Sequence, residues 1–238
     1  MALLPDLTQR RRRPELMDEP HLDARRHLHA LSGLARINFV SGSARTLWPA
    51  VHRLARTSTR SLRLLDLASG GGDVSIALAR KAARVGVALD VEGWDRSPLA
   101  VEHARARGVV PGGLCVRFAV YDVLSDPLPD DRDVICCSLF LHHLDEPAAI
   151  AFLQRIGQAA RKLVLVNDLA RGRSGLLLAH IATRVLTLSS VVHIDGPRSV
   201  EGAFTPEEAC RLAEEAGLHG ATVRRCWPCR YLLAWSRP

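Results

Sequence analysis

A glycine-rich segment follows the first long apolar run of the chain, and an acidic residue comes directly before it. The segment reads Asp66-Leu-Ala-Ser-Gly70-Gly71-Gly72-Asp73. Glycines let the backbone approach a ligand closely, and a helix that begins here offers unpaired N–H groups at its first turn. This combination is typical of a loop that holds a nucleotide-like cofactor.

The acidic residue distinguishes between two classes of such cofactors. A pyrophosphate is anionic and gains nothing from Asp66, whereas S-adenosylmethionine (SAM) carries an ammonium and a sulfonium that a carboxylate favours. The dinucleotide pattern G-x-G-x-x-G is also incomplete, because Gly70 and Gly72 are followed by Ser75 at the third position. We therefore expect SAM, and a nicotinamide-dependent oxidoreductase is the disfavoured alternative.

Two further acids follow the next apolar runs. Asp95 comes after residues 87–94 and can accept hydrogen bonds from both ribose hydroxyls, and Asp122 comes after residues 115–120 and can accept the adenine amino group. Open α/β sheets bind ligands at the carboxyl ends of their strands. Asp66 and these two acids are therefore expected to meet in one cofactor site.

Histidines supply the groups that could act on a methyl acceptor. Methyl transfer from SAM is an in-line displacement on a strong electrophile, so the protein must align a nucleophile and exclude water. An oxygen nucleophile also benefits from the loss of its proton. His143 could orient the acceptor or act as a base, and His193 with Asp195 could form a second base pair.

These residues need a parallel sheet to bring them together, and the apolar pattern predicts one. Continuous apolar runs that alternate with helices are typical of strands buried on both faces. The predicted fold class is α/β: a Rossmann-like, mostly parallel sheet of seven strands that ends in an antiparallel hairpin. Strands are expected over residues 61–67, 87–94, 115–120, 133–139, 163–167, 221–227 and 229–235, and crossover helices over 74–85, 99–107, 147–160 and 205–216.

The remaining segments are expected to surround the site. Residues 1–58 form an N-terminal arm and a helical lid, and residues 59–238 form the SAM-binding domain. Residues of about 170–204 form an insertion that covers the substrate, with an apolar helix over 175–190 and an irregular stretch over 193–204. The apolar helix could also form half of a homodimer contact.

Charge and composition restrict the partners and the location. The net charge is +7, but the basic cluster Arg10–Arg13 is interpreted as a solvated arm, and aromatic residues do not alternate with basic ones as in an RNA-binding surface. We expect no nucleic-acid partner. No apolar run reaches membrane-spanning length and no signal peptide is evident, so a cytoplasmic location is expected.

No metal site is expected from ligand spacing. The single CxxC motif, Cys226 and Cys229, is interpreted as structural, because a zinc site needs four ligands that usually come from two such pairs. A redox or metal pair is the alternative for these two cysteines. The scattered histidines and aspartates show no ligand pattern either.

The residues of the cofactor site resemble the class I SAM-dependent methyltransferases over residues 61–167, with Ala68 where that family often has its first glycine. A narrower resemblance to the ubiquinone/menaquinone-biosynthesis and polyketide-tailoring methyltransferases rests on Asn38, Ser41 and Trp48 and on the downstream "AFTPEE". It implies a lid of N-terminal helices over SAM and a lipophilic phenol, quinol or aromatic polyketide of secondary metabolism as the acceptor.

O-methylation of such a hydrophobic small molecule is the expected reaction. A C-methyltransferase for a quinol-type ring, an RNA or amine methyltransferase and a non-catalytic SAM-binding protein are the alternatives. The expected cofactor contacts are Arg36, Asp66, Ala68, Gly70, Gly72, Asp95, Arg96, Asp122, Val123 and Ser138, and the expected catalytic residues are His143, His193 and Asp195.

Overall fold

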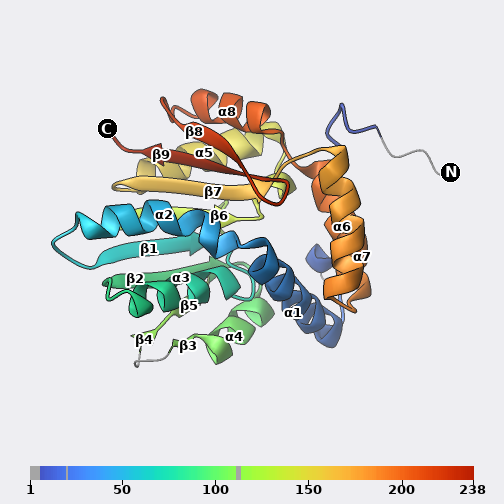
Figure 1. The fold of residues 1–238 in the computed structure, drawn as a ribbon, viewed down its shortest axis with the longest axis horizontal. Helices are drawn as coiled ribbons and strands as arrows, with labels where there is room; N and C mark the ends of the chain where they lie inside the picture. The colour runs from blue at the N-terminus through green and yellow to red at the C-terminus, as the bar shows by residue number, and fades with distance from the viewer. Residues whose placement is uncertain (1–5, 20, 111–113) are drawn as a thin grey trace.

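A seven-stranded sheet forms the centre of the protein (Figure 1). The structure, a computed structural model, describes residues 6–19, 21–110 and 114–238. The strand order is β5-β2-β1-β6-β7-β9-β8. The first five strands are parallel, and β9 is antiparallel to both of its neighbours, β7 and β8. The strands are β1 (Leu62–Leu67), β2 (Leu89–Asp95), β5 (Arg117–Val120), β6 (Val134–Ser138), β7 (Leu163–Leu169), β8 (Thr222–Cys226) and β9 (Arg230–Ser236).

The predicted fold class is therefore confirmed, and the strand register explains where the site forms. Leu67 pairs with Trp94 on one side and with Cys137 on the other, so that β1, β2 and β6 end at nearly the same level. Val120, at the end of β5, pairs with Asp95. The loops after these strands consequently emerge side by side at one edge of the sheet.

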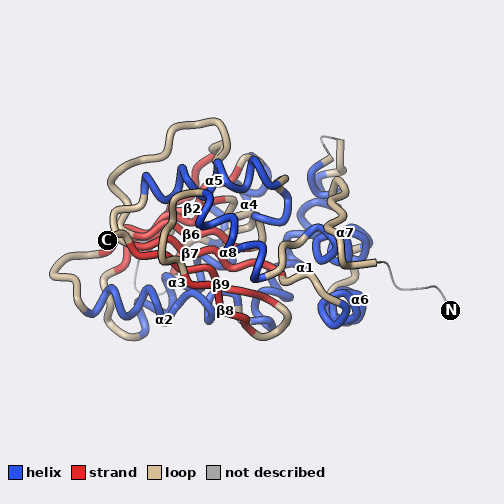
Figure 2. The backbone as a smooth tube through the Cα atoms, turned by 90° about the horizontal axis from the view of Figure 1, so that it is seen from above, coloured by secondary structure: helices blue, strands red, loops and turns tan. Residues whose placement is uncertain are grey.

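Helices cover both faces of the sheet, and a third group lies beyond the carboxyl ends of its parallel strands (Figure 2). The helices α2 (Ser43–Arg56) and α3 (Asp73–Arg84) pack on one face, where Leu47, Val51 and Leu78 meet Leu62 and Leu64. On the other face, α5 (Glu146–Ala159) and α8 (Pro206–Glu215) bury Phe152, Leu153 and Leu212 against Leu65 and Leu67. The third group contains α1 (Ala24–Ser41), α6 (Arg173–Leu186) and α7 (Ser190–Gly202).

Gly42 alone joins α1 to α2. Its φ of 71° lies in the left-handed region, where glycine has no steric penalty, and it ends one helix while it begins the next. The buried guanidinium of Arg230 donates to Asn38 Oδ1 at 3.2 Å and to the Ser43 hydroxyl, so that one side chain binds both helices beside their junction. Burial lowers the pKa of Arg230 to about 10.

The stretch over 193–204 is not irregular, contrary to our expectation from the sequence. Most of it belongs to α7, although Gly196 and Pro197 lie inside that helix. Both residues disfavour a helix interior, and they led to the wrong prediction. Val191, Asp195 and Ser199 are buried at four-residue spacing, so burial of one helical face outweighs the local preference.

The helix α6 packs beside α7 and presents an exposed apolar surface. Leu177, Ile181 and Val185 are more than half exposed. A homodimer that covers this surface stays a prediction. Within the described part of the chain, no helix combines the length and the apolar composition that crossing a membrane requires.

The N-terminal arm is bound to the protein surface through Arg10, whereas Arg11, Arg12 and Arg13 are exposed, in agreement with the interpretation of this cluster as solvated. Arg10 donates to the carbonyl oxygen of His142 at 2.7 Å and lies over the Phe204 ring, with its guanidinium carbon 3.6 Å from the ring centroid. Arg198 of α7 donates to the carbonyl oxygen of Pro14 at 3.0 Å. These contacts direct the following residues of the arm across the carboxyl ends of the strands.

Two further differences concern short elements. Cys115 belongs to a small separate hairpin of β3 (Val109–Val110) and β4 (Leu114–Cys115), so the third parallel strand begins only at Arg117. The remaining crossover helix is α4 (Pro98–Arg107), which Ser97 caps by accepting the N–H of Ala100. This cap begins a helix directly after Asp95 and Arg96.

Candidate functional site

A cavity of about 1250 Å³ lies at the carboxyl ends of the parallel strands. Its walls come from the loops after β1, β2, β5 and β6, from α1 and α7, and from the N-terminal arm. The sequence-predicted residues that line it are Asp66, Ala68, Gly70, Asp95, Arg96, Asp122, Val123, Ser138 and His143. One cavity thus brings together the expected cofactor residues of four strand ends and one of the expected catalytic histidines.

Asp66 gives one wall of the cavity a buried carboxylate. Burial raises its pKa to about 7, although Ser75 Oγ donates to it at 2.5 Å and Cys136 Sγ at 3.6 Å. Both donors are neutral, so the ionised carboxylate gains stability from a cationic ligand. The ammonium group of SAM fits this requirement.

Asp95 organises the backbone around it. Its Oδ2 accepts the N–H of Gly70 at 2.7 Å, and its Oδ1 accepts the N–H of Ser97 at 2.9 Å. Ser69 and Ser138 also line the cavity, and the hydroxyl oxygen of each is buried without a hydrogen-bond partner among the described residues. These hydroxyls fit a polar ligand, because buried polar groups are normally paired.

Asp122 lines the cavity, whereas Gly72 does not. Asp122 is exposed at the edge of the cavity, where one carboxylate oxygen accepts the N–H of Leu124 at 2.9 Å. Gly72 does not line the cavity but begins α3 with a φ of 75°, and a Cβ there would come 2.5 Å from Phe118 Cζ. The third glycine therefore allows close packing and does not touch the ligand space.

Ala68 adopts a φ of 53°, in the left-handed region. Leu139, at the corresponding position after β6, has a φ of 58°. Both residues line the cavity, and such backbone strain in non-glycine residues concentrates at ligand sites.

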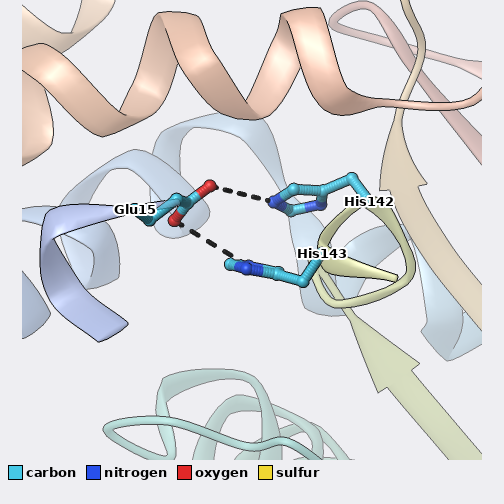
Figure 3. A group of neighbouring side chains, drawn as sticks. All are labelled: Glu15, His142 and His143. Carbon is cyan, nitrogen blue, oxygen red and sulfur yellow. Dashed lines mark ion pairs between the residues drawn. The ribbon is translucent and has the colours of Figure 1, made fainter. Parts of the chain in front are cut away.

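Two histidines and an acidic residue of the arm meet inside the cavity. Figure 3 shows the Glu15 carboxylate facing the edges of the two neighbouring imidazole rings, with one oxygen 3.5 Å from His142 Nε2 and the other 3.8 Å from His143 Nε2. His142 is buried, and its Nδ1 lies 2.7 Å from Asp168 Oδ1. Burial alone would lower the pKa of His142, but Asp168 and Glu15 outweigh this effect and raise it to about 10.

The arm also approaches the residue that follows Asp95. Arg96 Nη2 lies 2.6 Å from Asp18 Oδ1, and the other oxygen of Asp18 lies 3.3 Å from His143 Nδ1. The hydrogen bond with His143 is the main reason that the pKa of Asp18 lies below its usual value. Asp18 therefore connects the cofactor side of the cavity with the histidine side.

Besides Gly72, three of the sequence-predicted site residues lie outside the cavity. Arg36 is exposed and lines a separate pocket on the outer side of α1. His193 is bonded through Nε2 to the carbonyl oxygen of Thr187 at 2.8 Å. Asp195 is buried and accepts the N–H groups of Leu16 and Met17 at 2.9 and 3.1 Å, so it secures the arm instead of pairing with His193.

The sequence reasoning missed Glu15 and His142 and did not assign a partner to Asp168. The pair "HH" after an apolar strand was a usable signal for His142, since Asp168 ends the neighbouring strand of a parallel sheet. No local pattern identifies Glu15, which lies in a charged, proline-containing arm.

The sequence of the central sheet is shared with known methyltransferases. A family model described as a methyltransferase domain matches residues 64–162. Over 167 residues the chain is 30% identical to the demethylmenaquinone methyltransferase of Thermus thermophilus, and the match covers 65% of this chain and 73% of that protein. The chain belongs to the class I SAM-dependent methyltransferases. SAM is the cofactor of this family, in agreement with the donors and acceptors that line the cavity.

Another relative in the family is the ubiquinone biosynthesis O-methyltransferase of Aeromonas salmonicida (strain A449). It is 32% identical over 162 residues, which are 66% of this chain and 62% of that enzyme. The chain thus spans less than two thirds of the length of this relative.

Solved methyltransferase structures share the fold. The SAM-dependent methyltransferase SibL in its apo form has a TM-score of 0.61 and 24% identity, covering 94% of this chain and 61% of that chain. Magnesium protoporphyrin IX methyltransferase from Synechocystis PCC 6803 with bound SAH has a TM-score of 0.57 and 18% identity, covering 83% and 84%. These likenesses confirm the Rossmann-like methyltransferase sheet.

Proposed function

We propose that the protein transfers the methyl group of SAM to a hydroxyl oxygen of a lipophilic phenol, quinol or aromatic polyketide in secondary metabolism. One observation carries this proposal: the cavity that contains Asp66 and Asp95 also contains His143, which faces the same space from the loop after β6. Cofactor and acceptor groups thus share one enclosure.

Asp66 and Asp95 are assigned to the cofactor. Bound SAM supplies a methyl group on an electrophilic sulfonium. Asp66 holds the ammonium of its amino-acid part, and Asp95, with the N–H groups of Gly70 and Ser97 already on its carboxylate, accepts hydrogen bonds from the ribose. Asp122 and Val123 are assigned to the adenine, and the free hydroxyl of Ser138 to a polar atom of the ligand.

The acceptor side of the cavity combines apolar walls with the histidine group. The apolar side chains that line it include Met17, Leu22, Leu31, Leu34, Leu139 and Phe140. An aromatic ring can bury its faces against them and direct a hydroxyl toward His143. We assign to His143 the positioning of this hydroxyl in line with the transferred methyl group. The relatives whose names refer to ubiquinone and demethylmenaquinone support a quinol-like acceptor.

The covering role belongs to the arm, α1 and α7 in this proposal. Arg198 and Ser199 of α7 and the arm residues around Glu15 line the cavity, whereas no residue of α6 does so among those described. A cover made of these segments excludes water from the nucleophile, which methyl transfer requires. The substrate-covering part of the insertion is thus α7.

The test is turnover with SAM on a panel of phenols and hydroquinones that carry aliphatic or polyketide-like substituents. We expect a methoxy product, and His143→Ala should lower kcat/KM by about 100-fold, because misplacement of a nucleophile by about 1 Å has this effect. His219→Ala is the control, since His219 is exposed and pairs with Glu214 far from the cavity. An acid-stable ring methyl would establish the C-methyltransferase alternative, and SAM binding without turnover on any member of the panel would contradict the proposed acceptor class.

A further inference from the structure

We propose that Glu15, His142 and His143 bind one divalent transition-metal ion of the zinc type at the acceptor end of the cavity. One ligand atom of each residue lies within 4.8 Å of those of the other two. In a tetrahedral zinc site, ligand atoms at about 2.0–2.1 Å from the metal lie about 3.3 Å from one another. Glu15 Oε1 lies 3.5 Å from His142 Nε2 and Glu15 Oε2 lies 3.8 Å from His143 Nε2, so the carboxylate faces each imidazole with one oxygen at a separation close to this value.

The other nitrogen of each imidazole faces a carboxylate. His142 Nδ1 lies 2.7 Å from Asp168 Oδ1, and His143 Nδ1 lies 3.3 Å from Asp18 Oδ2. Metal-binding histidines almost always donate their second N–H to a carboxylate or carbonyl, which fixes the tautomer and orients the ring. Both rings are therefore oriented so that Nε2 is the ligand atom, and both Nε2 atoms point toward Glu15.

The donor set selects the class of metal ion. Two imidazoles and one carboxylate suit zinc and neighbouring transition metals, whereas magnesium and calcium prefer oxygen ligands. Three protein ligands leave a fourth position for a small molecule, which is the arrangement of catalytic zinc sites. His143 and Glu15 both line the cavity, so this open position faces the acceptor.

The metal ion gives the acceptor hydroxyl a route to ionise, and this part of the inference rests on the proposed function. On binding, the metal ion takes the place of any proton on His142 Nε2 and His143 Nε2, which is released to solvent. The phenolic oxygen then takes the fourth position, its O–H bond breaks, and that proton also leaves to solvent. The ionised oxygen forms the new bond to the methyl carbon while the carbon–sulfur bond of SAM breaks, with its electron pair kept by sulfur.

Metal binding is measured first without any methyl acceptor. The untagged full chain is stripped with a chelator and dialysed against Zn²⁺, and bound zinc is counted by mass spectrometry. We expect one zinc per chain, no displacement by millimolar Mg²⁺, and visible absorption bands of tetrahedral Co²⁺ when Co²⁺ replaces Zn²⁺. Glu15→Gln and His143→Ala should each weaken zinc binding by about 100-fold, and Asp18→Asn by about 10-fold.

His219→Ala is the matched control, because His219 Nδ1 lies 2.9 Å from Glu214 and forms an exposed histidine–carboxylate pair of the kind that binds zinc adventitiously. Circular dichroism establishes that each variant is folded. Equal zinc binding by wild type, Glu15→Gln and His143→Ala would overturn the proposal, and so would the loss of bound zinc in His219→Ala. If zinc does not bind but phenols are methylated, the metal site is refuted and the proposed function stands. If zinc binds as expected and no phenol is methylated, the metal site stands and the proposed function is refuted.

Discussion

The carboxylate of Asp95 accepts the N–H of Gly70 at 2.7 Å, so the acid that ends β2 holds the glycine loop that follows β1. The second carboxylate oxygen accepts the N–H of Ser97 at 2.9 Å, at the start of α4. The same side chain thus orders two loops and faces the cavity. The ribose-binding role that we propose for Asp95 uses a geometry that is already fixed in the free protein.

We expect Asp95→Ala to weaken SAM binding by about 100-fold, because about two hydrogen bonds to a charged group are lost at about 1.5 kcal/mol each. Titration calorimetry with SAM and S-adenosylhomocysteine measures the change. Asp90→Ala is the control, since Asp90 lies on the same strand but pairs with Arg117 at 3.0 Å. Equal effects of the two substitutions would contradict the assignment of Asp95 to the ribose.

The affinity for SAM should depend on pH through Asp66. Burial raises the pKa of this carboxyl to about 7 in the free protein, and a bound ammonium favours its ionised form, so the pKa falls on binding. The affinity therefore falls by about tenfold per pH unit below pH 7, and it also falls above about pH 8, where the ammonium of SAM loses its proton. SAM binding at pH 6 should be about fivefold weaker than at pH 7.5.

Two controls separate this effect from general acid sensitivity. Asp66→Asn should abolish the pH dependence, and 5′-methylthioadenosine, which lacks the ammonium, should bind the wild type with little change between pH 6 and pH 8. The free Asp66→Asn protein should also resist urea better than the wild type at pH 8, because its ionised carboxylate is destabilising above the folded-state pKa. A steep pH dependence that survives in Asp66→Asn would assign the titration to another group.

Substitutions at Gly72 and Gly86 separate the cost of a steric clash from the cost of backbone strain. Both have a positive φ, but a Cβ at Gly72 would lie 2.5 Å from Phe118 and 2.9 Å from Ala104, whereas a Cβ at Gly86 meets nothing within 4 Å. We expect Gly86→Ala to lower the free energy of unfolding by about 1 kcal/mol and Gly72→Ala by about 3 kcal/mol. Urea denaturation at equal m-values measures the difference, and equal losses would show that Phe118 moves aside without cost.

The attachment of the arm should depend on Asp195. Its carboxylate accepts the N–H groups of Leu16 and Met17, and loss of these bonds favours detachment by about tenfold or more. Limited trypsin digestion should cleave at Arg10–Arg13 correspondingly faster in Asp195→Ala. Asp6→Ala is the control, because Asp6 is exposed and bonds to Thr8. Unchanged cleavage in Asp195→Ala would mean that the other arm contacts are sufficient.

The parallel part of the fold could be predicted because its signals are local. Runs such as 62–67 and 163–169 are mostly apolar, which is typical of a strand buried on both faces, and the acids near their carboxyl ends were expected at one edge of the sheet. Most of the residues that we expected to bind the cofactor line the cavity because of this placement. Arg36 was an exception, since its position in α1 does not reveal which side of that helix faces the sheet.

The acceptor side could not be predicted, because its residues come together only through tertiary contacts. Glu15 reaches His142 and His143 since Arg10, Arg198 and Asp195 hold the arm in place, and no spacing in the sequence encodes this proximity. The expectation that no metal site exists rested on local ligand spacing alone. The helix α7 escaped prediction for a related reason, as its stability comes from burial rather than from its own residues.

A rotation of α1 about its junction with α2 at Gly42 moves the residues of α1 in proportion to their distance from Gly42. Leu31 lies eleven residues from Gly42 along α1, which is about 16 Å in a helix, so a rotation of about 10° at the junction moves Leu31 by about 3 Å. Leu31 and Asn38 both line the cavity. Arg230 bonds to both Asn38 and Ser43, so a residue of the last strand opposes this rotation and thereby restricts how far the wall that α1 contributes to the cavity can move.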